Sequence, residues 1–392
     1  MLEQMPPALH PTAGPLQPAA ACWRTPSAGA CWSTPPAGAL WRTGESAVAI
    51  VATVIARLRR MPVVSAAIAT AIAAVAVIAI AQVTGNHALS RAFEDVDALW
   101  IGLIAGAELI TYPAYAIAYR SIARVHGHAQ LALPLVARVV VAGFGPFAVG
   151  GGFGLDKQVL LALHEDEHSA RVRVLALGSL EWLVLAPATC IAAILMLAEG
   201  AHVRGSLLWP WAIAVPLGLG FGLWASAPGR SERICRFRGR RLAWLSSVLE
   251  GVGVMHTLIR SPRAHLGAWI GTLLYWAADI AAFYGGLRCF GLAPGIGEVI
   301  IAYATGYIAT RRSLPLGGAG VTEALMTYSL SWLGQPLAPA LAAVVAYRAF
   351  NFLLASTPAL IAHHQMEGLL DAAGRRKAEG DARTPQQAGG RV

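Results

Sequence analysis

Residues 311–324, RRSLPLGGAGVTEA, combine arginine, proline, glycine and glutamate between two strongly apolar runs. Arginine carries a fixed charge and presents donors that match phosphate oxygens. The glycines permit a sharp turn, and a helix beginning near Gly320 would add amide donors and a partial positive charge. The stretch therefore predicts a site for an anionic group, formed by Arg311, Arg312, Gly317, Gly318 and Gly320. In the alternative interpretation, the arginines are ordinary loop residues beyond the lipid headgroups.

Two further charges lie inside the apolar runs that follow. Glu323 stands about one helical turn after Gly320, and Arg348 lies about 11 residues into the run 337–362. An unpaired arginine near the centre of a membrane span costs at least ~2.5 kcal/mol. We therefore expect an acidic partner for Arg348, either Glu323 or Glu181. This ion pair is either structural or part of a substrate site. In another interpretation, Glu323 only stabilises the partial positive charge at the amino end of its helix.

A second glycine-rich stretch, GPFAVGGGFGLDK at residues 145–157, repeats this pattern earlier in the chain. Like the first, it leads to a charge deep in the following helix. We predict a second tip of the same site, reached from the cytoplasm, with Gly152, Gly154, Lys157 and Glu181. Near the middles of two other apolar runs lie Glu108 and Asp279, for which ion pairing, proton coupling and polar packing remain alternative roles.

The sequence HEDEH at residues 164–168 satisfies HExxH, in which two histidines one helical turn apart bind zinc and the glutamate activates water. Metalloproteases usually have uncharged residues where this chain has Asp166 and Glu167. Glu181 and Glu199 could supply a third ligand, but neither has distinctive surroundings. We interpret the segment as the polar cytoplasmic end of a hairpin and predict no metal site.

The composition indicates which elements position these residues. The chain is 56% hydrophobic and only 13% charged, which is typical of an integral membrane protein. A bilayer core about 30 Å thick requires about 20 apolar residues per helix. The predicted spans are 63–83, 98–119, 174–198, 207–227, 267–290 and 337–362. Arginines near span ends, which favour anionic lipid, explain the net charge of +9, so no nucleic-acid partner is expected.

Residues 133–163 and 298–333 are predicted to be hairpins that enter and leave the membrane by the same face. With this topology, 22 of the 30 Lys and Arg residues fall inside and three outside, as the positive-inside rule requires. If each of these regions were instead a single full crossing, the basic segment 228–265 would face the outside. Non-helical backbone at membrane depth must face protein or water, so the glycine-rich tips must line a polar space.

The expected fold is therefore an all-α polytopic membrane protein with about six full transmembrane helices and two re-entrant helical hairpins. Each half contains two spans, a hairpin and a final span, and the halves have opposite orientations. Such inverted repeats are common in transporters. Both termini are expected in the cytoplasm.

The chain is divided by composition into five parts. The first contains a nine-residue repeat that is rich in Pro, Ala and Gly and aligns Trp23, Trp32 and Trp41. The predicted parts are a disordered segment 1–45, a first repeat with the next span 46–227, a basic interfacial linker 228–265, the remaining second repeat 266–365, and a disordered cytoplasmic tail 366–392. The five cysteines have no metal-ligand spacing.

Residues 314–358 resemble the lysylphosphatidylglycerol synthase/flippase-like transmembrane family. The family pattern of Pro, Gly-Gly, Gly and Glu, followed by Tyr-Arg and a later Pro, is matched by Pro315, Gly317, Gly318, Gly320, Glu323, Tyr347, Arg348 and Pro358. The likeness covers roughly residues 60–365 and is most specific in the last part. In the first repeat, Glu181 matches an acidic position of the family, whereas Trp182 replaces the usual basic neighbour.

The resemblance implies a bacterial plasma-membrane protein that moves aminoacylated or otherwise modified lipids between leaflets. We expect no aminoacyl-transferase domain, no enzymatic activity and no cofactor. The expected partners are a phospholipid or lipid-linked substrate, the bilayer and a lipid-modifying enzyme. Two other functions remain as alternatives: a membrane-embedded zinc metalloprotease that uses HEDEH, and a non-transporting scaffold that binds an enzyme through the linker 228–265. The sequence leaves the lipid, the direction, the energy source and the oligomeric state open.

Overall fold

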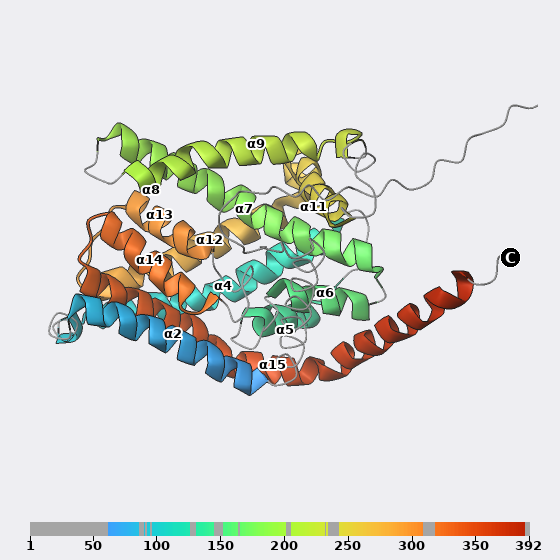
Figure 1. Ribbon diagram of the computed structural model, residues 1–392, viewed down its shortest axis with the longest axis horizontal. Coiled ribbons are helices and arrows are strands. Elements are labelled where there is room, and N and C mark those ends of the chain that lie inside the picture. Colours follow the sequence, from blue (N-terminus) through green and yellow to red (C-terminus); the bar gives the residue numbers. More distant parts are fainter. Residues whose placement is uncertain are drawn as a thin grey trace, which may run out of the picture. The chain divides into compact units, whose positions relative to one another are not determined.

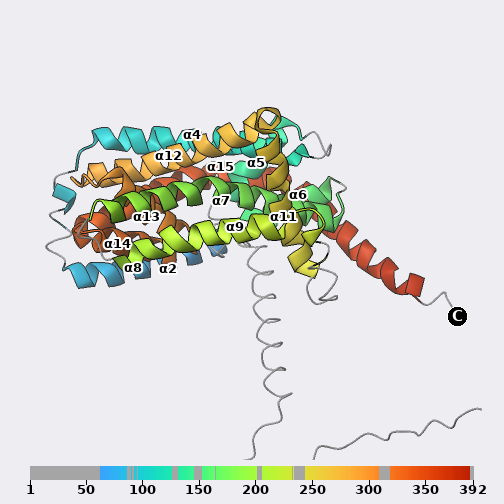
Figure 2. The same ribbon diagram turned by 90° about the horizontal axis from the view of Figure 1, so that it is seen from above.

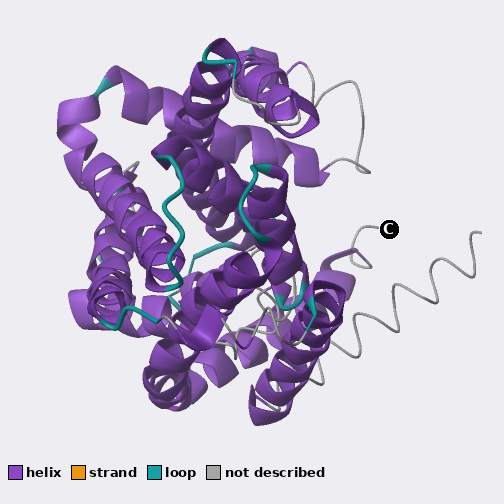
Figure 3. Cartoon of the chain, turned by 90° about the vertical axis from the view of Figure 1, so that its left-hand side faces the viewer, coloured by secondary structure: helices purple, strands orange, loops and turns teal. Residues whose placement is uncertain are grey.

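The structure is a computed structural model of the full chain. It describes residues 62–85, 90, 92–94, 96–125, 131–144, 152–163, 165–200, 205–231, 233, 243–308 and 318–388. These residues form helices and connecting loops, and no strand is present among them (Figure 3). The all-α expectation is therefore confirmed for the described part of the chain. The predicted disordered segment 1–45 and residues 46–61 of the predicted first repeat lie outside it.

Six helical segments of the described chain are long and apolar enough to cross a membrane. They coincide with the six predicted spans. The segments are α2 (Pro62–Thr84), α4 (Leu99–Ala123), α7 (Glu167–Ala198), the series α8 (Gly205–Trp209), η2 (Pro210–Ala214) and α9 (Val215–Ala225), the pair η4 (Pro262–His265) and α12 (Leu266–Cys289), and α15 (Leu337–Ala388). The chain is a multi-pass membrane protein.

Four shorter helices occupy the two predicted hairpin regions. They are α5 (Leu133–Phe144), α6 (Gly152–Ala162), α13 (Ile296–Tyr307) and α14 (Val321–Trp332). At 1.5 Å per residue, a helix of 11 or 12 residues is about 17 or 18 Å long, much less than the bilayer core. None of the four is therefore long enough to cross the bilayer alone.

The segment Gly205–Ala225 is built around two prolines. Pro210 and Pro216 lack the amide donor that a regular helix uses. The chain forms a wider π-helical turn, η2, between α8 and α9, and this arrangement accommodates the missing bonds. Trp211 of this turn donates its Nε1–H to Thr305 Oγ1 at 3.3 Å, which ties the segment to α13.

Helices α4 and α12 form the most extensive helix pair and lie side by side (Figure 2). Close contact is possible because glycines of α12 face α4. A Cβ atom at Gly271 would lie 2.6 Å from the amide nitrogen of Ala118 and 2.7 Å from the carbonyl oxygen of Ala114. Membrane helices associate through such close backbone contacts, because lipid provides little hydrophobic driving force between them.

The remaining helices pack in a reciprocal pattern around this pair. Helix α5 of the first half packs against α15 of the second, while α13 of the second half packs against α7 of the first. Helix α2 contacts α14 and α15, and it runs beside α15 in Figure 1. Helix α9 contacts α7 and α11 (Ala243–Arg260). Helix α11 lies within the predicted linker 228–265 and packs against α7. Its buried residues include Leu249, Met255 and Leu258.

The C-terminal part of α15 differs from the expectation of a disordered tail beginning at residue 366. The helix continues through Ala388. This part is rich in Ala, Glu, Leu, Arg and Lys, which have high intrinsic helix propensity. Low hydrophobicity therefore correctly marks the end of the predicted span, but it does not mark the end of the helix.

The contact between α4 and α12 predicts the effect of substituting Gly271. The variant Gly271→Ala should lower the free energy of unfolding by about 1–3 kcal/mol, because the new methyl group overlaps the backbone of α4. Gly102→Ala in α4 is the matched control, since a Cβ there meets no atom within 4 Å. Unfolding in detergent should separate the two variants, and equal stabilities would contradict this packing.

Candidate functional site

The central feature of the site is an ion pair between Glu323 of α14 and Arg348 of α15. The Nε of Arg348 donates to Glu323 Oε1 at 2.8 Å, and the side chains are 6% and 3% exposed. The other carboxylate oxygen, Oε2, accepts the amide hydrogen of Gly320 at 2.6 Å. The predicted pairing of Arg348 with Glu323 is confirmed. The Gly320 amide, which we expected to be available to an anion, is instead bonded to Glu323.

Gly320 is required at the start of α14 for two reasons. Its φ of +82° is a conformation that residues with a Cβ rarely adopt. A Cβ atom would also lie 3.1 Å from Ile72 Cγ2 and 3.3 Å from the carbonyl oxygen of Ile72 in α2. The turn at Gly320 thus brings the first turn of α14 against α2 and orients Glu323 toward α15.

The ion pair lies in the wall of a pocket between α2, α14 and α15. The pocket has a volume of about 380 Å³. Small residues of α2, including Ala69, Thr70 and Ala73, form one wall. On the other side, the guanidinium carbon of Arg348 lies 4.3 Å from the ring centre of Phe352, which is a cation–π contact. The pocket therefore combines two opposite charges with largely apolar walls.

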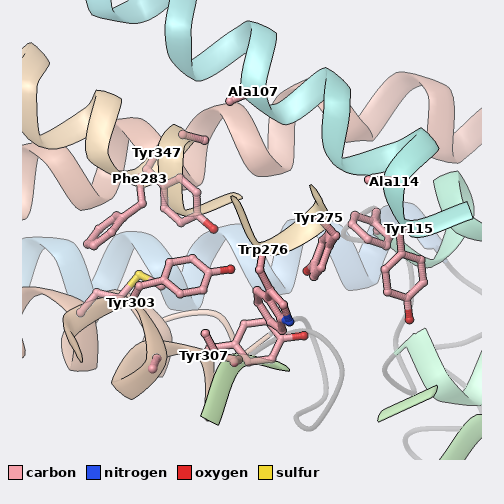
Figure 4. Packing of buried hydrophobic residues seen from close by; sticks show 14 of the residues in the cluster. Ala107, Ala114, Tyr115, Tyr275, Trp276, Phe283, Tyr303, Tyr307 and Tyr347 are labelled. Carbon is pink, nitrogen blue, oxygen red and sulfur yellow. The ribbon is translucent and has the colours of Figure 1, made fainter. Parts of the chain in front are cut away.

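A second carboxylate, Asp279 of α12, is held by two tyrosines. Tyr303 of α13 donates its hydroxyl to Asp279 Oδ2 at 2.6 Å, and Tyr347 of α15 donates to Oδ1 at 2.7 Å. Asp279 is 2% exposed. Figure 4 shows the rings of Tyr303 and Tyr347 beside Phe283, within the aromatic cluster of the core. These bonds connect three helices through one buried carboxylate.

Glu181 of α7 has a similar environment. Its carboxylate accepts hydrogen bonds from Tyr115 of α4 at 2.7 Å and Tyr307 of α13 at 2.8 Å. The indole of Trp276 donates to the Glu181 carbonyl oxygen at 3.1 Å. In the same way, Asn351 of α15 donates its side-chain amide to Glu108 at 2.8 Å. The second predicted partner of Arg348 is therefore held by tyrosines in this structure.

Glu181 also borders a second pocket, of about 360 Å³. Trp182 and Tyr307 lie beside Glu181 in its wall, and their ring centres are 5.9 Å apart. Gly218 and Gly222 of α9 form part of the opposite wall. Like the pocket at the ion pair, this one places a buried carboxylate at the edge of an apolar space.

The predicted site residues fall into separate places. Arg311, Arg312, Pro315 and Gly317 lie outside the described residues, so their placement stays a prediction. Gly318 and Gly320 precede α14 next to Glu323, whereas Gly152 and Gly154 begin α6. Tyr347 lies directly before Arg348 in α15, but its hydroxyl donates a hydrogen bond to Asp279.

Lys157 takes part in a different contact. Its Nζ lies 2.7 Å from Glu167 Oε1 at the amino end of α7, and Arg171 donates to the same oxygen at 3.1 Å. This group of charges is partly exposed. Lys157 therefore pairs with an acidic residue ten positions away in the chain and is not part of the Glu323–Arg348 contact.

The residues of HEDEH that the structure describes are engaged in polar contacts. Glu165 pairs with Arg173, and His168 Nε2 lies 2.7 Å from Glu250 Oε2. Asp166 caps α7 by accepting the amide hydrogen of Ser169, and hydrogen bonds from the side chain and then the backbone of Ser169 lower the pKa of Asp166. His164 lies outside the described residues. Within the described part of the chain, no three His, Cys, Asp or Glu side chains are grouped to hold a metal ion.

Four residues that hold the buried carboxylates were not predicted from the sequence: Tyr115, Tyr303, Tyr307 and Asn351. One available signal was the spacing of Tyr303 and Tyr307, which lie one helical turn apart in an apolar helix. Polar hydroxyls on the same face of such a helix indicate a polar partner within the protein. The partner itself could not be identified without knowing which helices meet.

The fold and the buried charges define a polytopic helical membrane protein with a polar interior at span depth. Residues 63–359 match the family described as the lysylphosphatidylglycerol synthase TM region. The chain belongs to this family, as the resemblance of residues 314–358 predicted. No significant match was found among curated proteins.

The ion pair predicts a characteristic pattern of stabilities. Arg348→Met should lower the free energy of unfolding by about 3–5 kcal/mol, because Glu323 would remain buried without its partner. Adding Glu323→Leu removes the second charge and should restore much of that loss. Thermal unfolding in detergent measures both variants. If the double variant were less stable than Arg348→Met, the two charges would not compensate each other.

Proposed function

We propose that this protein moves a lipid or lipid-linked molecule between membrane leaflets. The anionic or aminoacylated headgroup of that molecule passes through a polar cavity within the membrane. The observation that carries this proposal is the Glu323–Arg348 pair at the edge of the pocket between α2, α14 and α15. Buried charges in membrane helices are costly and commonly mark substrate pathways. The family match supports a role connected with lipids.

The chemistry of the pocket suits a molecule with both a charge and acyl chains. A headgroup phosphate can take the place of the Glu323 carboxylate on Arg348, since both are oxygen anions that match a guanidinium group. An ammonium group of an aminoacylated lipid can take the place of Arg348 on Glu323. The apolar walls from α2 and Phe352 can contact the hydrocarbon at the same time.

The ion pair also permits exchange between bound and empty states. While it is closed, each charge satisfies the other, so the empty pocket does not contain an isolated charge. A headgroup that replaces one partner must compensate for breaking the pair. In this mechanism Arg311, Arg312 and the glycine-rich tips attract the headgroup, and the Glu323–Arg348 pair opens as the cavity alternates.

Alternating access further requires elements that can rearrange, and we propose that the two helix pairs are re-entrant hairpins in inverted repeats. The lengths of α5, α6, α13 and α14 support this topology, because each is too short to cross the bilayer. The reciprocal packing of α5 on α15 and α13 on α7 supports the repeat relationship. The two pockets, each beside a buried carboxylate, are consistent with it.

We further propose a bacterial plasma-membrane location with both termini in the cytoplasm, based on the positive-inside distribution and the family. The protein acts as a carrier, without a cofactor and without catalysing a chemical reaction. A lipid-modifying enzyme is its proposed source of substrate. The bilayer and a phospholipid or lipid-linked molecule are its direct partners.

Purified protein in vesicles of phosphatidylethanolamine and phosphatidylglycerol tests this function. Movement of a fluorescently labelled phosphatidylglycerol between leaflets is measured by quenching the label in the outer leaflet. We expect Glu323→Gln and Arg348→Lys to slow the movement by about tenfold or more, since each alters a charge-assisted hydrogen bond. The charge of Arg348→Lys is retained, so this variant separates geometry from charge.

Glu250→Gln is the matched control, because Glu250 is an exposed carboxylate paired with His168 outside the pocket. It should move the lipid at the wild-type rate. Lysylphosphatidylglycerol in place of the labelled lipid tests whether an aminoacylated headgroup is preferred. If folded wild-type protein moved neither lipid, the translocase proposal would fail, and a scaffolding role would explain the family relationship better.

A further inference from the structure

Asp279 is a buried carboxylate that the proposed lipid pocket does not use. It lies in α12 and is 2% exposed, and each of its oxygens accepts one tyrosine hydroxyl. Among the residues that the structure describes, no Lys, Arg or His forms an ion pair with it. Glu323, in contrast, is neutralised by Arg348. Asp279 thus differs from the acidic residue of the pocket in how its charge is compensated.

Two tyrosine hydroxyls provide an environment that suits both forms of a carboxyl group. With both hydroxyls donating, as observed, the two oxygens act only as acceptors, which is the hydrogen-bonding role of the ionised group. When a proton binds, one oxygen gains an O–H bond and becomes a donor. Because a tyrosine hydroxyl can accept as well as donate, rotation of one hydroxyl preserves both contacts.

The contacts of Asp279 lead directly to the proposed lipid pocket. Tyr347 bonds to Asp279, and the next residue of α15, Arg348, bonds to Glu323. Tyr303 connects the same carboxylate to α13 of the second hairpin region. A change in the protonation of Asp279 therefore reverses the direction of one of the two hydrogen bonds that connect α12 to α13 and α15.

Other charged groups face this region from the neighbouring helices. From α4, Glu108 bonds to Asn351 of α15, and its charge acts on Tyr347 together with that of Arg348. From α7, Glu181 bonds to Tyr307, which lies one helical turn from Tyr303 on α13. The described groups around Asp279 thus include two further carboxylates and the one arginine of the ion pair.

We propose that Asp279 binds and releases one proton in each transport cycle and that Tyr347 couples this step to the Glu323–Arg348 pair. The proton comes from water on one side of the membrane, forms an O–H bond with a carboxylate oxygen, and returns to water on the other side. No oxidation or reduction is involved. This inference rests on the proposed translocase function, since it identifies a source of energy for that movement.

Proton binding can be measured without any lipid transport. Infrared difference spectra of the purified protein, recorded between mildly acidic and mildly alkaline buffer, show the C=O band of a protonated carboxyl group. We expect a band that shifts in deuterated water, is lost in Asp279→Asn and remains in Glu250→Gln. Asn has the same shape as Asp and can bond to both tyrosines, so this variant should remain folded. If the same band persisted in Asp279→Asn, or wild type had none, Asp279 would not be the proton site.

Coupling is measured with the labelled phosphatidylglycerol in vesicles that carry a pH gradient. With one proton moved per lipid, a gradient of about one pH unit shifts the steady-state distribution of the lipid by about tenfold. Asp279→Asn should still equilibrate the lipid but lose this shift. Tyr347→Phe should weaken the response to the gradient while retaining the infrared band. A wild-type protein that moves the lipid equally with and without the gradient would overturn the coupling, while the translocase function would stand.

The infrared and transport results also distinguish the two proposals from each other. If wild-type protein showed the Asp279 band but moved no lipid, the translocase function would fail and the energy-coupling inference would fail with it. If it moved lipid without the band, only the inference would fail.

Discussion

The ion pair between Glu323 and Arg348 joins α14 to α15 inside an apolar helix assembly. Neither charge is tolerated alone at this depth, so the chain must bring α14 and α15 together at these residues. Three other features hold the pair in place: the Gly320 amide bonded to Glu323, the packing of Gly320 on α2, and the contact of Arg348 with Phe352. The pocket beside the pair is therefore a consequence of how these helices meet.

Tyrosine–carboxylate hydrogen bonds extend the same principle through the core. Asp279 connects α12 to α13 and α15, and Glu181 connects α7 to α4 and α13. Helix α13 takes part in both connections through Tyr303 and Tyr307. Because buried polar groups are costly without partners, these bonds specify which helices are adjacent more precisely than apolar packing does. A movement of α13 would change the surroundings of both carboxylates.

The sequence predicts the parts of this structure that depend on local composition or on a single strong cost. Apolar length located the six spans, and the cost of an unpaired arginine predicted Glu323 or Glu181 as the partner of Arg348, of which the structure shows Glu323. The tyrosine contacts were not predicted, because they join residues far apart in the chain, such as Tyr307 and Glu181. Lys157 was assigned to the site from its glycine-rich surroundings, but its charge is satisfied by nearby Glu167. Arg311 and Arg312 were also assigned to the site, but they lie outside the described residues, so their placement stays a prediction.

The proposed lipid pathway requires that α13 and α14 form a hairpin that enters and leaves the membrane by one face and carries Glu323 into its interior. Cysteine accessibility tests it most directly in a variant without the native cysteines. Single cysteines at Ala293 and Pro336 would flank the two helices, at exposed positions. A membrane-impermeant thiol reagent applied to oriented vesicles should label both from the same side. Labelling from opposite sides would contradict the hairpin and the lipid pathway built on it.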